Sequence, residues 1–326
     1  MRILLASSHR YPASAQQGSG FHPKTYPSGS GYHLHDLLAR GLIEEGHTVY
    51  YALAKGVESP LPPGVEPVAA LTSATPLPDI DIIHAPIGAP GFSDLIAGLA
   101  AEHGKPCLLT CHMVEAGRIP KPNWVYVSQA IAQAYGSSRV VLNGLDPGDF
   151  IYSETKQDYL LFIAAMNRAL EKGLDIALAL SQKKGIKLKV AGTGLNYETI
   201  REVGALCQAA QAEYLGDVRG PRKAELIANA KALLFCSRLT EGTPLVLIEA
   251  LLSGTPVISS RSGGAIEIVT AETGFLCSSP EEWSSAVDRL GEISPAACRK
   301  LAVEKFHYRR MVRDFVTEYR REIARA

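Results

Sequence analysis

Short apolar runs alternate with helical patterns along almost the whole chain. The runs are continuous rather than interrupted at every second residue, which is typical of parallel strands covered by helices on both faces. We expect strands at 2–8, 48–54, 81–86, 106–112, 125–128, 139–144, 159–165, 187–192, 212–217, 232–237 and 256–260. Between them the spacing predicts helices at 32–46, 92–104, 174–184, 197–211, 221–231, 244–253 and 281–292. Two such series in succession predict an α/β protein with two doubly wound parallel-sheet domains.

A polar segment with Pro and Gly, residues 145–159, interrupts this pattern and marks the expected domain boundary. We predict an N-terminal domain at 1–150, a second domain at 151–307, and a last helix, 308–326, that could pack back on the N-terminal domain. Ligands of open α/β sheets bind beyond the carboxyl ends of the strands. The cleft between the two domains is therefore the default ligand site.

The last part of the chain, 304–326, has a long helical pattern with one apolar stripe. The stripe consists of Phe306, Met311, Phe315 and Tyr319. Arginines on the other face could touch anionic lipid, but a solvated outer face is the interpretation we favour.

Composition narrows the function classes. The 326 residues include 33 Lys and Arg and 33 Asp and Glu, so the basic surplus that is typical of nucleic-acid binders is absent. The six cysteines form no C-x-x-C pair, which favours reduced thiols over disulfides or a zinc site. The N-terminus becomes polar too soon for a signal peptide, and no stretch approaches the ~18 apolar residues of a membrane span. We expect a cytoplasmic protein.

The stretch EGTPLVLIEALLSGTPVI (241–258) carries the strongest chemical signal. Thr243 and Pro244 predict a helix start, with Thr243 as the N-cap, and the helix that follows is apolar on all sides and hence buried. Glu249 in its second turn needs a partner, because an unpaired buried carboxylate is costly. Glu249 either forms a buried structural ion pair, lies exposed at an edge, or binds the vicinal hydroxyls of a ribose.

The start of this helix is also suited to an anion. Free N–H groups and the helix dipole attract phosphate, and Gly242 lets a ligand approach the backbone closely. Glu241, just before the helix, is placed to reach the group attached to that phosphate. The pattern therefore predicts a sugar, a diphosphate and a ribose along one helix start.

The spacing Glu241-x7-Glu249 within EGTPLVLIEALLSGTPVISSRSGGAIEIV resembles the signature of the retaining glycosyltransferases of family 4, which have the GT-B fold of two Rossmann-like domains. The likeness extends over nearly the whole chain, because further segments resemble those of the family in the family's order. They are SGSGYHLHDLLARGLIEEGHTV (28–49), DIIH (81–84), TCHM (110–113), VSQAIAQAYG (127–136), VLNGLDPGDF (141–150), LEKGLDIALAL (170–180), VAGTG (190–194), YLGDV (214–218) and ETGFL (272–276).

The resemblance implies roles for individual residues. Glu249 would bind the donor ribose, Glu241 the hydroxyls of the donor sugar, and Lys172 the diphosphate leaving group. His112, at the end of a strand, would face the donor sugar from the first domain. The remaining implied donor-binding residues are Gly29, Ser30, Gly31, Gly192, Gly194, Gly242, Thr243, Pro244 and Leu245.

Two departures from the family pattern stand out. The family has an arginine five residues before the lysine, where this chain has Asn167, or Ala165 if the alignment follows the preceding strand. Arg168 is the nearest guanidinium and would fill the catalytic role through a rearranged loop. The usual Gly-Gly of the first loop is Gly29-Ser30-Gly31 here.

The resemblance implies a retaining, metal-independent transfer of a sugar, a hexose by expectation, from a nucleoside-diphosphate sugar to a hydroxyl of a small soluble acceptor. A UDP-sugar is favoured as co-substrate, and no cofactor is expected. The Asp79-x-Asp81 pair mimics a metal motif but opens a strand, and the long segment 8–31 carries aromatic residues that could cap an acceptor. The alternatives are a sugar-nucleotide-binding protein of the same fold without transfer activity and a nucleotide-sugar epimerase.

Overall fold

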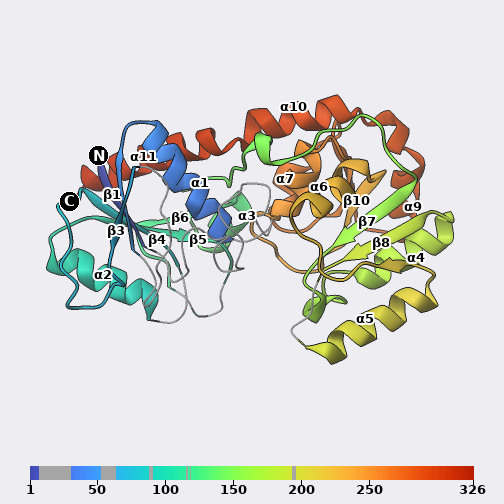
Figure 1. The fold of residues 1–326 in the computed structure, drawn as a ribbon, viewed down its shortest axis with the longest axis horizontal. Coiled ribbons are helices and arrows are strands. Elements are labelled where there is room, and N and C mark those ends of the chain that lie inside the picture. Colours follow the sequence, from blue (N-terminus) through green and yellow to red (C-terminus); the bar gives the residue numbers. More distant parts are fainter. Residues whose placement is uncertain (7–30, 53–63, 88–90, 115–116, 118, 193–195) are drawn as a thin grey trace. The chain divides into compact units, whose positions relative to one another are not determined.

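The computed structural model divides into two compact units (Figure 1). The first unit comprises Met1–Asp146 with Phe306–Ala326, and the second comprises Pro147–Lys305. The structure describes residues 1–6, 31–52, 64–87, 91–114, 117, 119–192 and 196–326. The helix that ends the chain belongs to the first unit.

The first unit is built on a six-stranded parallel sheet with the order β3-β2-β1-β4-β5-β6. Helices α1 and α11 lie beside each other on one side of this sheet and α2 lies on the other (Figure 1). The elements are β1 (Arg2–Ala6), α1 (Gly31–Glu44), β2 (Thr48–Ala52), β3 (Val65–Val68), β4 (Ile82–Pro86), α2 (Phe92–Glu102), β5 (Cys107–Cys111), β6 (Trp124–Tyr126), α3 (Gln129–Ala134) and α11 (Tyr308–Ile323).

The second unit repeats this topology with the order β12-β11-β10-β7-β8-β9. Counted from its own first strand, each sheet has the strand order 3-2-1-4-5-6 of doubly wound nucleotide-binding folds. The elements are β7 (Tyr159–Ile163), α4 (Leu174–Lys184), β8 (Lys187–Ala191), α5 (Tyr197–Ala209), β9 (Glu213–Tyr214), α6 (Gly220–Asn229), β10 (Ala232–Phe235), α7 (Leu245–Leu252), β11 (Val257–Ser260), α8 (Ala265–Ile268), β12 (Gly274–Cys277), α9 (Pro280–Asp288) and α10 (Pro295–Phe306).

Each sheet buries its apolar strands between helices, as the continuous runs predict. The inner strands β1 and β10 are buried over nearly their full lengths, and each unit has its own hydrophobic core. The predicted α/β class and the two doubly wound sheets are confirmed. All six cysteines are free.

Two predictions about elements are wrong, and two strands were missed. Residues 139–144 form no strand, and only isolated bridges join Val140 to Tyr126 and Leu145 to His307. The chain is held there by contact instead, because a Cβ on Gly144 would lie 2.8 Å from the His307 carbonyl oxygen. The last helical pattern is two helices, since His307 has extended backbone and separates α10 from α11. The short edge strands β3 and β12 were not predicted.

A partly buried lysine joins the carboxyl ends of α6 and α7. Lys156 Nζ donates to the carbonyl oxygens of Ala228, at 2.7 Å, and Ser253, at 3.3 Å. It also donates to Thr255 Oγ1 at 3.0 Å, and that hydroxyl donates to the Ile227 carbonyl at 2.6 Å. Burial lowers the pKa of Lys156 to about 8.

Lys156→Met should therefore lower the free energy of unfolding by about 1–3 kcal/mol, because buried acceptors lose their donor. Urea unfolding followed by circular dichroism measures the change. Lys231→Met is the matched control, since Lys231 pairs with Asp158 at the surface. Equal urea midpoints for Lys156→Met and the wild type would contradict the assignment.

Candidate active site

Lys172 and Glu241 meet at the point where the strand order of the second sheet reverses. Lys172 lies in the loop after β7 and Glu241 in the loop after β10. These two strands are neighbours at the centre of the sheet, with β8 and β9 beyond β7 and with β11 and β12 beyond β10. Such switch points are where doubly wound sheets bind ligands. The two side chains form an ion pair, each about 20% exposed, and Ser237 Oγ donates to Glu241 Oε1 at 2.9 Å. The predicted catalytic residues Lys172 and Glu241 therefore do lie together.

Close backbone packing holds the loop of Lys172. Gly173 has φ 79°, and a Cβ there would lie 2.2 Å from the Cys236 carbonyl oxygen, so no other residue fits. Arg238 N donates to the Glu171 carbonyl at 2.9 Å. The Arg238 guanidinium donates two hydrogen bonds, of 2.8 and 2.7 Å, to the Asp175 carboxylate. These bonds lower the pKa of the Asp175 carboxyl.

A glycine turn holds Glu241 from the other side. Gly263 has φ 50°, and a Cβ there would lie 2.1 Å from the Glu241 carbonyl oxygen. Gly264 N donates to that oxygen at 2.9 Å. Sequence reasoning did not assign Ser237, Gly263 or Gly264 a role, although the Gly-Gly pair in the quoted motif was a signal for a close backbone approach.

Helix α7 starts one residue later than predicted. Pro244, with φ −70° and ψ 98°, takes the cap position, and no side chain caps the helix. The expectation that Thr243 is the N-cap is therefore wrong, because the extended ψ of Pro244 keeps it out of the helix. Gly242 and Thr243 are partly exposed just ahead of Leu245, so the amino end of α7 lies directly after Glu241.

Glu249 is completely buried within α7. Its Oε2 lies 2.9 Å from Lys223 Nζ of α6, so the structure contains the buried ion pair that was one interpretation from the sequence, and the edge-exposed alternative is wrong. Neither carboxylate oxygen has a hydrogen bond of good geometry to the described residues. Lys223 was not identified from the sequence, because nothing in a linear pattern joins residues of two different helices.

Arg168 lies beside the Lys172–Glu241 pair, and its carbonyl oxygen accepts a hydrogen bond from Lys172 N at 2.8 Å. It ends a short 3₁₀ turn, and its Nε donates to Glu171 at 2.5 Å, with about half of the side chain exposed. The bond to Glu171 raises the pKa of the guanidinium, and the charge of Glu241 adds to that effect. Arg168 is thus within electrostatic reach of Glu241.

Only some of the glycines predicted to bind the donor lie among the described residues. Gly192 follows β8 with φ 142°, and a Cβ there would lie 1.8 Å from the Ala164 carbonyl oxygen, so the tight turn requires glycine. Gly194, Gly29 and Ser30 lie outside the described residues, and Gly31 is the first residue of α1.

His112 belongs to the first unit, where it follows β5 and is partly buried. Burial lowers its pKa to about 4, so the ring is neutral at pH 7. It lines a small cavity with His84 and Thr110, and His84 bridges Thr110 Oγ1 and the Tyr319 hydroxyl at 2.6 Å each. Helix α11 is thereby linked to the strand that carries His112.

The Asp79-x-Asp81 pair is bound by Arg2, whose backbone N–H donates to Asp81 at 2.7 Å. Within the described part of the chain, no group of His, Cys, Asp and Glu side chains is arranged to hold a metal ion. Metal independence remains a prediction.

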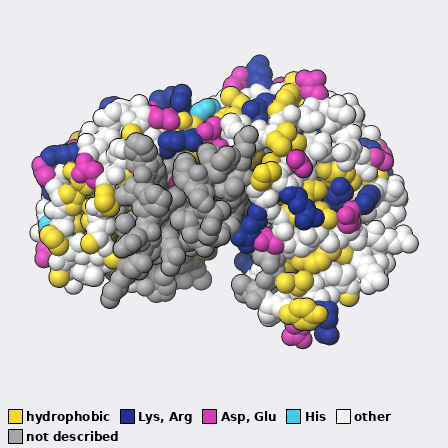
Figure 2. Space-filling model, in the orientation of Figure 1, with side chains coloured by type: hydrophobic (Ala, Val, Ile, Leu, Met, Phe, Trp, Pro, Cys, Tyr) yellow, Lys and Arg dark blue, Asp and Glu magenta, His cyan; other side chains and the backbone are white. Residues whose placement is uncertain are grey.

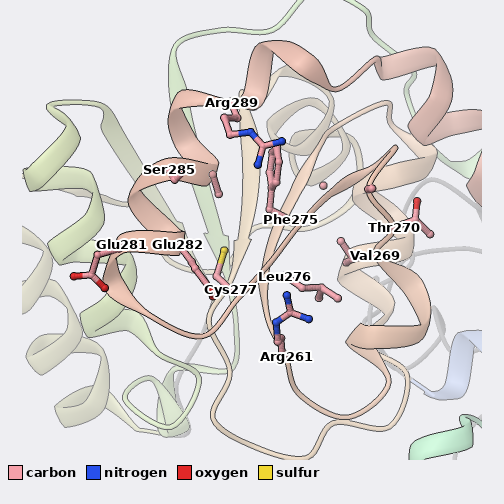
Figure 3. Close-up of a pocket in the computed structure, with 13 residues that line it drawn as sticks. Arg261, Val269, Thr270, Phe275, Leu276, Cys277, Glu281, Glu282, Ser285 and Arg289 are labelled. Atoms are coloured by element: carbon pink, nitrogen blue, oxygen red, sulfur yellow. The ribbon is translucent and has the colours of Figure 1, made fainter.

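A separate hollow of about 590 Å³ follows the edge strand β12 and helix α9 (Figure 3). Arg289 lies over the Phe275 ring, 4.9 Å from its centroid, at one end, and Arg261 lies at the other. The hollow is lined by none of the predicted site residues. On the face of the molecule in Figure 2, basic and acidic side chains are interspersed over the described surface.

Comparison with known proteins identifies the second unit. Residues 157–292 match the family described as "Glycosyl transferases group 1". The chain carries a glycosyltransferase domain. Along its whole length it is similar to AviGT4, a glycosyltransferase involved in avilamycin A biosynthesis, with 25% identity and a TM-score of 0.76 over 100% of this chain and 99% of that one. Its fold is GT-B, as the sequence led us to expect.

Two more distant relatives complete the comparison. The phosphatidylinositol N-acetylglucosaminyltransferase gpi3 subunit of Schizosaccharomyces pombe is 29% identical over 48% of this chain and 35% of its own length. The match thus spans about a third of that curated relative. HepE of Anabaena, solved with UDP, shares the fold with a TM-score of 0.66 at 13% identity, over 97% of this chain and 99% of its own. No helix among the described residues combines the length and apolar character needed to cross a membrane.

Proposed function

We propose that the protein is a retaining glycosyltransferase of family 4 that transfers a hexose from a nucleoside-diphosphate sugar to an acceptor hydroxyl without a metal. The observation that carries this proposal is the Lys172–Glu241 ion pair at the switch point, directly ahead of the amino end of α7. An ammonium, a carboxylate and a helix start together match a sugar joined to a diphosphate.

In this reaction Lys172 and the amino end of α7 stabilise the negative charge that builds up on the departing diphosphate. Arg168 adds a second positive charge once its loop turns from Glu171 toward the phosphates. Glu241 accepts hydrogen bonds from hydroxyls of the donor sugar and releases Lys172 to the phosphate. The acceptor hydroxyl attacks the face that the diphosphate leaves, and a phosphate oxygen takes its proton.

His112 binds a hydroxyl of the donor sugar, as the resemblance to family 4 implies. Its neutral ring donates from one nitrogen and accepts at the other, so it is suited to a sugar hydroxyl. For the acceptor we favour a small soluble molecule and a cytoplasmic setting. The aromatic segment 8–31 that could cap such an acceptor lies almost entirely outside the described residues.

Nucleotide binding tests the proposal first. UDP should raise the melting temperature more than GDP or ADP, since binding to the folded state stabilises it. We choose UDP as the first probe because HepE was solved with it. Glu249→Ala should weaken the binding of UDP and of a UDP-sugar equally. Glu241→Ala should mainly reduce the additional affinity that the sugar gives to a UDP-sugar over UDP. Equal UDP affinity in the wild type and Glu249→Ala would contradict the assignment of the ribose-binding acid.

Product analysis separates the alternatives. Transfer to an acceptor with the anomeric configuration of the donor kept supports a retaining transferase. Binding without transfer or hydrolysis across a broad acceptor panel favours a binding protein. Conversion of the nucleotide sugar without any acceptor indicates an epimerase.

A further inference from the structure

The Lys223–Glu249 pair is buried, charged and incompletely hydrogen-bonded. Lys223 is 7% exposed and Glu249 is 0% exposed, and a single contact of 2.9 Å joins them. A carboxylate can accept about four hydrogen bonds, yet neither oxygen of Glu249 has one of good geometry within the described residues. Burial in this state is costly, which indicates that a ligand completes the site.

The position of the pair fits the donor site. Helix α6 follows β9 and helix α7 follows β10, and the two helices pack against each other. Lys223 is in the first turn of α6, and Glu249 is in the second turn of α7. The side chain of Lys223 keeps 8% of its surface exposed and that of Glu249 keeps none, so a ligand of Glu249 has to displace the lysine in part.

We propose that Lys223 and Glu249 together form the ribose subsite of the nucleotide donor, with Lys223 as a specificity-determining residue. This inference rests on the proposed function. A ribose hydroxyl is donor and acceptor at once, so each hydroxyl of the cis-diol donates to Glu249 and accepts from Lys223. A carboxylate alone would accept hydrogen bonds from the two hydroxyls but would donate none to them. Lys223 turns slightly outward to admit the diol while staying in contact with it.

The pair should discriminate against a nucleotide that lacks one hydroxyl. A hydrogen bond to a charged group contributes about 1.5–3 kcal/mol, which corresponds to roughly 10- to 100-fold in affinity. Wild-type protein should bind UDP at least about tenfold more tightly than 2′-deoxy-UDP. Lys223→Met should reduce this preference below about threefold, and Lys223→Arg should retain most of it.

Isothermal titration of UDP and 2′-deoxy-UDP measures the ratio in each variant. Lys156→Met is the matched control, because it introduces the same side chain in place of a partly buried lysine that bonds the opposite, carboxyl ends of α6 and α7. It should lower the melting temperature and leave the ratio unchanged. A ratio that falls in Lys223→Met but not in Lys156→Met supports the proposal.

Three results would overturn the inference. They are an unchanged ratio in Lys223→Met, an equal fall in Lys156→Met, and a wild-type preference below about twofold, which needs no variant to fold. Failure of the proposed function is distinguishable, because the wild type would then either bind none of UDP, GDP and ADP or bind a nucleotide sugar without transferring the sugar.

Discussion

Lys172→Ala should lower kcat about 10²- to 10³-fold and change the affinity for the nucleotide far less. The ammonium is aimed at charge that develops as the diphosphate departs, and one such preorganised donor typically contributes about 3–4 kcal/mol to the transition state. Initial rates with a UDP-sugar at saturating acceptor measure kcat, and titration with UDP measures binding.

The matched control for this experiment is Lys183→Ala. Lys183 is an exposed lysine in the last turn of α4 in the same unit, so its loss should leave kcat within about twofold of the wild type. Lys172→Arg should recover part of the lost rate, since it keeps the positive charge. A kcat for Lys172→Ala within about threefold of the wild type would exclude Lys172 from leaving-group stabilisation.

Acidification should destabilise the first unit through His84. Burial, with a smaller contribution from the neighbouring His112, lowers the pKa of His84 from its usual 6.5 to about 3. As the pH falls below about 6.5, His84 is therefore protonated in the unfolded chain but stays neutral in the folded protein. The stability contributed by the neutral ring is fully present above pH 6.5 and declines as the pH falls toward 3. At about 1.4 kcal/mol per pH unit, the total loss is roughly 4–5 kcal/mol.

Urea unfolding between pH 7 and pH 4 measures this dependence. His84→Gln should be less stable at pH 7, because it disturbs the bonds to Thr110 and Tyr319, but its stability should fall less steeply with acid. His103→Gln, at an exposed histidine of the same unit, should keep the wild-type slope. Identical slopes in His84→Gln and the wild type would refute the role of His84.

Local patterns predicted the inner strands well and the edges poorly. Strands such as β1, β7 and β10 are buried on both faces, so apolar runs mark them directly. The edge strands β3 and β12 have only four residues each, and Glu66 and Pro67 interrupt the apolar residues of β3. Residues 139–144 have the composition of a strand, but contact between Gly144 and the backbone of His307 and Tyr308 decides their conformation.

The candidate site divides in the same way. The need for a partner at Glu249 was predictable from one helix, because an acid among apolar residues is costly wherever it is buried. The identity of that partner was not, since Lys223 is 26 residues away in the chain and reaches Glu249 only through the packing of α6 on α7. The same holds for Gly263, whose fit against Glu241 depends on two loops meeting.

By itself, the sequence determined that this chain forms two parallel sheets and places an acid before, and another inside, one buried helix. Those features follow from periodicity and from the cost of burying charge, which act over a few residues. Only the tertiary structure decided that Lys172 pairs with Glu241 and Lys223 with Glu249. Such pairs depend on distances between side chains on different strands and helices, and the order of strands in the folded sheet sets those distances.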